Sequence, residues 1–270
     1  MYEAFFEMQR TPFTRDISAS ELYESNAMAN ALGRLTYTAD RQLFAVVSAD
    51  AGCGKSTLIR RFVSSLPKEE YIPLYLSDSK LTPRWFYKGM LEQLGIESKF
   101  YRGDAKRQLQ KEIEILRGVH NKKVVCILDE AHLLEKETIE EFRFLLNYKF
   151  DSMSPLALVL VGQTELWDKL RLKYYTAVRQ RIDIHCVLPR LDRAESQRYI
   201  QSHLNYANGK EDIFTDRAVD DIYRETAGIL RRINRLCEKS LMYAFQQNKR
   251  LIDEHSVKYV IEHEMLGGDS

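Results

Sequence analysis

Short, almost wholly apolar runs alternate with segments of helical periodicity along roughly the first two thirds of the chain. The runs are bounded by polar or turn-forming residues, which predicts buried strands. They lie at 43–48, 71–76, 123–128, 156–161 and 182–187. Apolar positions at helical spacing lie at about 20–37, 56–66, 83–94, 105–119 and 138–148. Strands that are apolar on both faces and alternate with helices predict an α/β fold with a parallel five-stranded sheet, covered on both sides.

The pattern changes after Pro189, which ends the last predicted strand. No further strand pattern follows, and helical periodicity continues to the end of the chain, punctuated by Gly209 and Gly228. The predicted helices lie at 192–206, 215–226, 231–247 and 253–265. We therefore place a boundary at 189–191, between a larger α/β domain (1–190) and a small helical domain (191–270).

Composition narrows the class of protein without identifying it. With 44% hydrophobic and 29% charged residues, the chain can bury an ordinary globular core. The formal net charge of +1 excludes a histone-like affinity for nucleic acid but allows a local basic patch. The four cysteines are widely spaced, which favours reduced thiols. The N-terminus is no signal peptide, and no run reaches the about 18 apolar residues of a membrane span, so we expect a cytoplasmic protein without a membrane partner.

The first candidate for chemistry is the loop at 49–57, ADAGCGKST, which follows a strand and opens a helix. In that context backbone N–H groups can surround a phosphate, Lys55 can reach the β/γ oxygens and the Ser56 hydroxyl can ligate Mg²⁺. Ala49 stands where the usual pattern has glycine. The alternative is a glycine-rich turn with a chance Lys-Ser pair. The nucleotide-binding residues predicted from the loop are Ala51, Gly52, Cys53, Gly54, Lys55, Ser56 and Thr57.

The second candidate is the acidic pair at the end of the third predicted strand. Ligands of open α/β sheets bind at this edge, so Asp129 is expected to hold Mg²⁺ through water. Glu130 is expected to activate the attacking water as a general base. The alternative is an acidic helix cap before Ala131. His132 is assigned no chemistry.

Three further positions extend the predicted site. Gln163 follows the fourth strand, where its amide could contact the γ-phosphate or the lytic water; a helix-capping turn is the alternative. A guanidinium at Arg179 or Arg181, before the last strand, suits the charge of a transferring phosphoryl group. Arg231 lies in the first turn of a helix, against the preference of the helix dipole for acids. Each arginine could instead form an ordinary surface ion pair.

Taken together, these motifs resemble the AAA+ ATPases. The resemblance implies an AAA+ nucleotide-binding core at 1–190, a helical lid domain at 191–270, and ATP and Mg²⁺ as cofactors. It places Arg231 as the sensor arginine that reaches the γ-phosphate from the lid. It identifies Arg181, with Arg179 in reserve, as a finger toward a neighbouring subunit's nucleotide, which implies a homo-oligomer.

Within AAA+, the opening residues Tyr2 to Phe13, the stretch LVGQTEL at 160–166 and RRINRLC at 231–237 are similar to the general-secretion ATPase A family. Transposon regulators of the TnsC/TniB-like kind share that architecture, and the resemblance adds Phe13 to the nucleotide-binding residues. Because the chain ends soon after the lid, we expect the transposon branch. That branch implies rings or filaments on duplex DNA that direct or activate a transposase.

A local basic cluster is compatible with duplex binding. Contacts of such side chains with phosphates are sequence-tolerant and salt-sensitive. The predicted DNA-binding residues are Lys80, Thr82, Arg84, Lys99, Tyr101 and Arg102, with Lys88, Lys106 and Arg107 nearby. The alternative is a solvated charged face diluted by acids. Trp85 and Phe86 are expected in the core rather than against bases.

Two other functions are compatible with the same motifs. One is an ATPase that acts on protein partners, of the secretion-assembly type. The other is a replication initiator or loader. The response of ATPase rate and assembly to duplex DNA would separate them.

Overall fold

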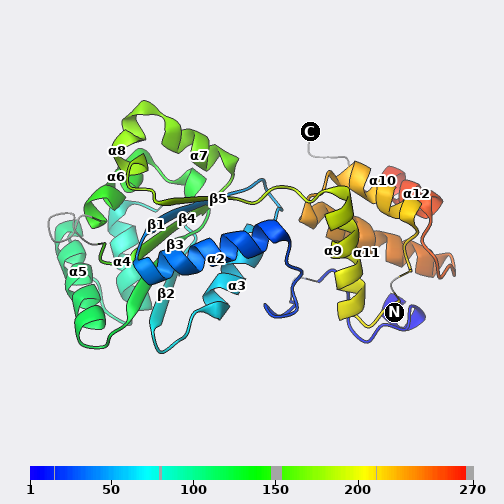
Figure 1. Ribbon diagram of the computed structural model, residues 1–270, viewed down its shortest axis with the longest axis horizontal. Helices are drawn as coiled ribbons and strands as arrows, with labels where there is room; N and C mark the ends of the chain where they lie inside the picture. The colour runs from blue at the N-terminus through cyan, green and yellow to red at the C-terminus, as the bar shows by residue number, and fades with distance from the viewer. Residues whose placement is uncertain (15, 79–80, 147–153, 211, 266–270) are drawn as a thin grey trace. The chain divides into compact units, whose positions relative to one another are not determined.

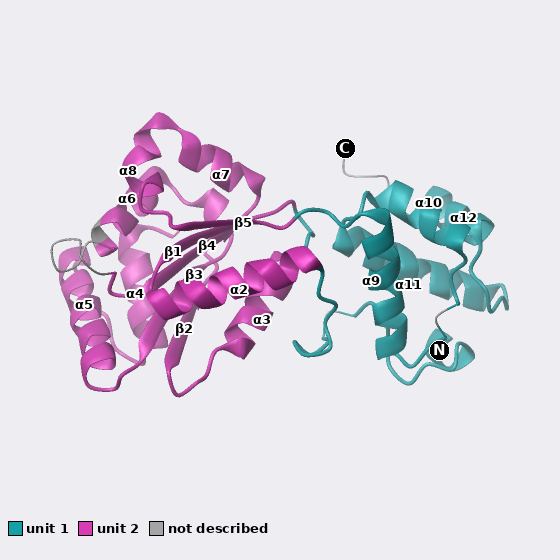
Figure 2. Cartoon of the chain, in the orientation of Figure 1, with its two compact units in different colours: residues 1–25, 51–54, 189–270 teal, residues 26–50, 55–188 magenta. Residues whose placement is uncertain are grey.

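The computed structural model describes residues 1–14, 16–78, 81–146, 154–210 and 212–265, and it contains two compact units. The sheet unit consists of Asn26–Asp50 and Lys55–Leu188. The helical unit consists of Met1–Ser25, Ala51–Gly54 and Pro189–Ser270. Figure 2 colours the two units separately. Among the described residues, no helix is both long and apolar enough to cross a membrane.

The sheet unit is built on five parallel strands, as expected from the sequence. They are β1 (Phe44–Ser48), β2 (Tyr71–Leu76), β3 (Lys123–Leu128), β4 (Ala157–Gly162) and β5 (Ile184–Val187), arranged in the order β2-β3-β4-β1-β5 (Figure 1). The predicted limits of β2 and β3 are confirmed, and the other strands begin one or two residues later than predicted. The apolar runs identify these strands because parallel strands buried on both faces have few polar positions.

Helices cover both faces of the sheet. Those of this unit are α2 (Asn26–Arg41), α3 (Lys55–Ser65), α4 (Pro83–Gln93), α5 (Arg102–Gly118), α6 (Lys136–Leu145), α7 (Thr164–Arg171) and α8 (Thr176–Arg179), with 3-10 turns η1 (Ala131–Leu133) and η2 (Lys173–Tyr175). Helix α2 lies across β3, β4, β1 and β5 together with α3, while α4 packs on β2 and α5 on β3 (Figure 1). Helix α2 begins later than the predicted residue 20, and α7 was not anticipated.

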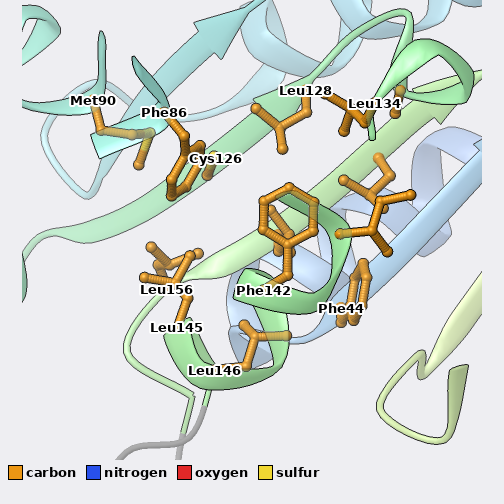
Figure 3. Packing of buried hydrophobic residues seen from close by; sticks show 14 of the residues in the cluster. Phe44, Phe86, Met90, Cys126, Leu128, Leu134, Phe142, Leu145, Leu146 and Leu156 are labelled. Atoms are coloured by element: carbon orange, nitrogen blue, oxygen red, sulfur yellow. The ribbon is translucent and has the colours of Figure 1, made fainter. Parts of the chain in front are cut away.

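The main core lies between the sheet and α4, α5 and α6. Alternate strand residues, such as Phe44 and Val46 on β1 or Cys126 and Leu128 on β3, enter this cluster because successive side chains of a strand point to opposite faces. Phe142 of α6 packs among them, edge-on to Phe86 of α4 (Figure 3). The core thus holds the strand ends that carry the candidate site in fixed register.

The helical unit has its own core, formed by α9 (Arg193–Tyr206), α10 (Asp216–Thr226), α11 (Leu230–Gln246) and α12 (Glu254–His263). The short helix α1 (Tyr2–Phe5) packs on α11, and Tyr2, Phe6 and Met8 are buried in the same cluster. Residues 1–25 therefore pack with the C-terminal helices, whereas the sequence analysis counted them with the α/β domain. The reason is tertiary: their aromatic side chains complete a core whose other members lie some 190 residues away along the chain, as the hydrogen bond between Phe13 and His203 illustrates.

Candidate nucleotide site

The candidate site of the sheet unit lies where β1, β3 and β4 end. Ser48 of β1 is in register with Gly162 of β4, and the N–H of Ala49 donates to the Gly162 carbonyl at 3.2 Å. On the next strand the N–H of Asp129 donates to the Leu76 carbonyl at 2.8 Å. The loop after β1, the acidic pair after β3 and Gln163 after β4 thus leave the sheet at its carboxyl edge, where α/β folds bind ligands.

Two glycines give the loop after β1 its shape. Gly52 has φ +81° and Gly54 has φ +93°, a region that residues with a Cβ rarely adopt. Turned backbone of this kind directs consecutive N–H groups toward one point, as an anion requires. These two φ angles explain why the loop has glycine at positions 52 and 54.

Lys55 is the first residue of α3 and only 8% exposed. Its ammonium group donates to the carbonyl oxygens of Ala49 and Asp50, at 2.8 and 3.1 Å. A buried charge of this kind must be hydrogen-bonded. The carbonyls hold the ammonium beside the loop, ahead of a helix whose first turn carries no acid. Ser56 is exposed and Thr57 half-buried in that first turn.

Within the helical unit, Ala51–Gly54 packs against the start of α11. The N–H of Arg231 donates to the Gly52 carbonyl at 3.2 Å. A Cβ added to Gly52 would lie 3.0 Å from the Cβ of Arg231 and 3.1 Å from a methyl carbon of Ile229. Glycine is therefore needed here for close packing as well as for its φ angle. The side chain of Arg231 is exposed in the first turn of α11, where it was expected.

Asp129 is 7% exposed, and both its carboxylate oxygens accept hydrogen bonds. The N–H of Glu130 donates to Oδ1 at 2.8 Å, and the hydroxyl of Tyr75 donates to Oδ2 at 2.7 Å. Burial, followed by this hydrogen bond to the carboxylate, raises the pKa of Tyr75, so the phenol keeps its proton and remains a donor. Tyr75 is a site residue that the sequence analysis missed, because only the pairing of β2 with β3 brings it to Asp129.

Glu130 and Gln163 both contact His132. Glu130 has a left-handed backbone with φ 52°, and its side chain is 47% exposed. Its Oε2 atom lies 3.6 Å from Nδ1 of His132. Gln163 precedes α7 but makes no side-chain cap; its amide nitrogen lies 3.1 Å from Nε2 of His132 instead. Gln163 occupies the N-cap position of α7, and its carbonyl oxygen accepts from the N–H of Leu166 at 2.9 Å, so the expected capping turn is present without a side-chain cap. The role of Gln163 toward a phosphate stays a prediction.

The two arginines before β5 differ in their described contacts. Arg179, at the end of α8, donates to the carbonyl oxygen of Arg171 at 2.8 Å, which ties α8 to the end of α7. Arg181 is half-buried in the turn that follows. The assignment of either residue as a finger toward a neighbouring subunit stays a prediction.

Phe13, the predicted nucleotide contact from the N-terminal segment, is buried in the helical unit. It is 4% exposed, and its ring stacks on His203 at 5.0 Å between centroids. Its N–H donates to Nδ1 of His203 at 3.2 Å, and its φ of 59° is rare for an aromatic residue. These contacts account for a structural role of Phe13, and its nucleotide contact stays a prediction.

The predicted DNA-binding residues include a surface where cations and aromatic rings meet. We call it the basic-aromatic face; its residues are Thr82, Arg84, Trp85, Lys88, Lys99, Phe100 and Tyr101. The Arg84 guanidinium lies 4.2 Å from the Phe100 ring centroid, and the Lys88 ammonium 4.5 Å from that of Trp85. Trp85 is 51% exposed, so its predicted place in the core is wrong: the start of α4 turns it outward while Phe86 enters the core.

Other cations of that region are already paired. Lys106 donates at 2.9 Å to the buried carboxylate of Glu141, which also accepts from Tyr87 at 2.6 Å. Arg102 pairs with Glu137 at 3.2 Å and Arg107 with Asp104 at 2.6 Å. Thr82 caps α4 by accepting from the N–H of Trp85. Lys80 lies outside the described residues.

The residues of the site fit a nucleotide and a magnesium ion. Glycine backbone at positive φ, the buried ammonium of Lys55 and the start of α3 suit phosphate oxygens. The hydroxyl of Ser56 and the carboxylate of Asp129 are hard oxygen ligands of the kind that Mg²⁺ uses together with water and substrate phosphates.

Comparison with known proteins identifies similar sequences and folds. Residues 38–170 match the family model described as AAA domain. The chain is 30% identical over 257 residues to general secretion pathway protein A of Aeromonas hydrophila. The aligned region covers 93% of this chain but only 46% of that protein, so the chain spans about half the length of this relative. Among solved structures, Cdc6p from Pyrobaculum aerophilum aligns with a TM-score of 0.71 at 15% identity, over 96% of this chain and 71% of that one. Drosophila ORC bound to DNA aligns with a TM-score of 0.66 at 18% identity, over 98% of this chain and 65% of that one.

Proposed function

We propose that this chain binds ATP and hydrolyses it with Mg²⁺, since residues 38–170 match the AAA domain model and the fold is that of AAA+ P-loop ATPases. The observation that carries the proposal is that Lys55, which is hydrogen-bonded to the residues after β1, and the acidic pair Asp129-Glu130, which follows β3, lie at the same edge of the sheet. Magnesium would supply charge neutralisation on the phosphates when bound.

Each residue has a distinct task in this proposal. The N–H groups of Ala51 to Gly54 and the Lys55 ammonium bind phosphate oxygens. Ser56 and Asp129 hold the metal, and the Tyr75 hydroxyl fixes the orientation of the Asp129 carboxylate. Glu130, whose carboxylate is more exposed than that of Asp129, accepts a proton from the attacking water.

We propose further that the active form is a homo-oligomer. Arg181, or Arg179 in its place, would then contact the nucleotide of a neighbouring subunit, while Arg231 and Phe13 would contact the nucleotide of their own. The support is the resemblance of these positions to the arginine-finger and sensor arginines of AAA+ proteins. A guanidinium in such a place stabilises charge on a transferring phosphoryl group.

We also propose that the oligomer forms a ring or filament on duplex DNA, in the cytoplasm, and directs or activates a transposase. The basic-aromatic face supports the DNA part, because Arg84 and Lys99 are exposed and make no described ion pair with an acid. A replication initiator or loader fits equally well, since the structural neighbours include an ORC bound to DNA. An ATPase acting on protein partners is favoured instead by the similarity to general secretion pathway protein A.

One experiment tests ATP hydrolysis and separates these functions. ATPase rate and assembly size are measured for the wild type and Glu130→Gln, with and without random-sequence duplex DNA. We expect Glu130→Gln to bind ATP normally, to lose about 100-fold or more in turnover, and to accumulate as ATP-bound assemblies on DNA.

Each possible result has a stated meaning. Normal turnover in Glu130→Gln would refute the assigned role of this carboxylate. A wild type whose rate and assembly ignore duplex DNA would refute the DNA-dependent function and leave the protein-partner alternative. Assembly on DNA that is then stimulated by a transposase, rather than by a helicase, would favour transposition over replication.

A further inference from the structure

His132 lies between the two residues to which hydrolysis and phosphate sensing are assigned. Its side chain is 11% exposed, and Nδ1 is 3.6 Å from the Glu130 carboxylate. On the side of β4, Nε2 lies 3.1 Å from the amide nitrogen of Gln163, and the Gln163 N–H points at Nδ1 from 3.4 Å. One imidazole therefore contacts residues that follow two neighbouring strands, β3 and β4.

The imidazole cannot make all of these contacts with one placement of its proton. A neutral ring has one N–H donor and one acceptor nitrogen. If Nδ1 accepts from the Gln163 N–H, the proton is on Nε2, and Glu130 gains no donor. If Nε2 accepts from the Gln163 amide, the proton is on Nδ1 and faces Glu130, slightly beyond hydrogen-bond distance. The orientation of the Gln163 amide therefore selects whether the imidazole turns an N–H or a lone pair toward Glu130.

Contacts that do not involve the imidazole ring hold the backbone around His132. Lys169 of α7 donates to the carbonyl oxygen of His132 at 3.2 Å and also to that of Leu134. A Cβ added to Gly162 would lie 3.1 Å from the backbone nitrogen of His132, so β4 and η1 approach closely. Since these contacts place η1, the ring contacts are left to orient the side chains of Glu130 and Gln163.

We propose that His132 is a positioning residue that couples Gln163 to Glu130. When Gln163 turns its amide to a phosphate, the contact with Nε2 changes and the imidazole redistributes its proton. Nδ1 then accepts from the Gln163 N–H, no imidazole N–H faces Glu130, and its carboxylate is free to accept a proton from water only in the phosphate-bound arrangement. This inference rests on the proposed function, because it assigns His132 a part in ATP hydrolysis.

The test compares turnover with binding in a double-mutant cycle. Turnover and the affinity for a fluorescent ATP analogue are measured for His132→Ala, Gln163→Ala and the double variant. We expect each single variant to lose about tenfold or more in kcat while its Kd changes by less than about twofold. The double variant should be no slower than the slower single variant, because each substitution already removes the same interaction between Gln163 and His132.

Lys169→Met is the matched control, because it removes contacts of the same segment without touching the ring. We expect it to lower the Tm but to leave kcat near that of the wild type. Losses that multiply in the double variant, or an equal loss of kcat in Lys169→Met, would assign His132 a merely structural role and overturn the proposal.

A second measurement does not depend on hydrolysis. In protein labelled with ¹⁵N-histidine, the ring-nitrogen shifts of His132 should change in Gln163→Ala and in Glu130→Gln, while those of the exposed His120 stay unchanged. A wild type without ATPase activity would refute the proposed function, and the shifts would still decide the coupling. His132 shifts that ignore both substitutions would overturn it.

Discussion

At the scale of single residues, the described histidine whose pKa is lowered most is His203 of the helical unit. It is 4% exposed, stacked on Phe13, and its Nδ1 accepts the Phe13 N–H. Burial lowers the pKa of His203 from 6.5 to about 4. Nδ1 of His203 must stay unprotonated in order to accept this hydrogen bond. A proton on Nδ1 would break the bond, which holds Phe13 in its left-handed conformation.

The low pKa of His203 predicts a loss of stability in acid. Between about pH 6.5 and pH 4 the unfolded chain binds a proton at this residue and the folded chain does not, so the free energy of unfolding falls as the pH falls. Integrated over that window, the loss is about 3 kcal/mol. Urea denaturation at pH 7 and pH 4.5 measures it, and His203→Asn, which keeps an acceptor but does not titrate, should lose correspondingly less.

His120→Asn is the control for this prediction, because His120 is exposed. That variant should retain the full difference in stability between the two pH values. If His203→Asn retained it as well, the acid sensitivity would belong to other groups.

At the scale of secondary structure, the link between α10 and α11 is determined by close backbone contact. Helix α10 ends at Thr226; Ala227 caps it with φ 49°, and Gly228 follows with φ +74°. The N–H of Leu191 donates to the Gly228 carbonyl at 3.1 Å. A Cβ on Gly228 would lie 1.9 Å from the carbonyl oxygen of Leu191, so no side chain fits. This glycine sets the direction in which α11, with Arg231 in its first turn, leaves α10.

We therefore expect Gly228→Ala to destabilise the helical unit by about 3 kcal/mol or more, through both the positive φ and the clash. Gly33→Ala is the matched control, because Gly33 lies inside α2 and a Cβ there meets no atom within 4 Å. That substitution should stabilise by about 0.5–1 kcal/mol. Thermal denaturation measures both, and a wild-type Tm for Gly228→Ala would contradict the packing argument.

At the scale of the whole molecule, charge is nearly balanced, so affinity for DNA must come from a local surface. The net charge of +1 offers no general attraction for a polyanion. On the basic-aromatic face, Arg84 and Lys99 are exposed next to the exposed rings of Phe100 and Tyr101. Neighbouring cations such as Lys106 are already paired with acids, so the predicted cluster contributes less charge than a count of its lysines and arginines implies.

The double variant Arg84→Gln/Lys99→Gln should weaken duplex binding and reduce the dependence of log K on log[salt] by about 1.8. Binding titrations of ATP-bound protein at several salt concentrations measure this slope. The control is Lys68→Gln/Lys122→Gln, which removes the same two positive charges from the opposite end of β2 and β3. There, Lys68 precedes β2 and Lys122 precedes β3. Equal slopes for the two double variants would show that general charge, not this face, binds DNA.

Local patterns were sufficient for the sheet and for the motifs contiguous in sequence. Apolar runs predicted all five strands because strands buried on both faces contain little else. The glycines before Lys55 and the acidic pair after β3 could be read directly, since each motif is contiguous in sequence. Contacts between distant segments could not be read in this way. The contact of Tyr75 with Asp129 requires the pairing of β2 with β3, and the contact of His132 with Gln163 requires that of β3 with β4.

The sequence by itself determined the strands, the glycine loop before Lys55 and the acidic pair after β3, because periodicity and motif spacing are local properties of a chain. Only the tertiary structure decided that residues 1–25 pack with the C-terminal helices, that Trp85 turns outward, and that His132 stands between Glu130 and Gln163. Each of these depends on which surfaces meet after folding. Which surfaces pack together depends on the whole core, so no single segment of the sequence reveals it.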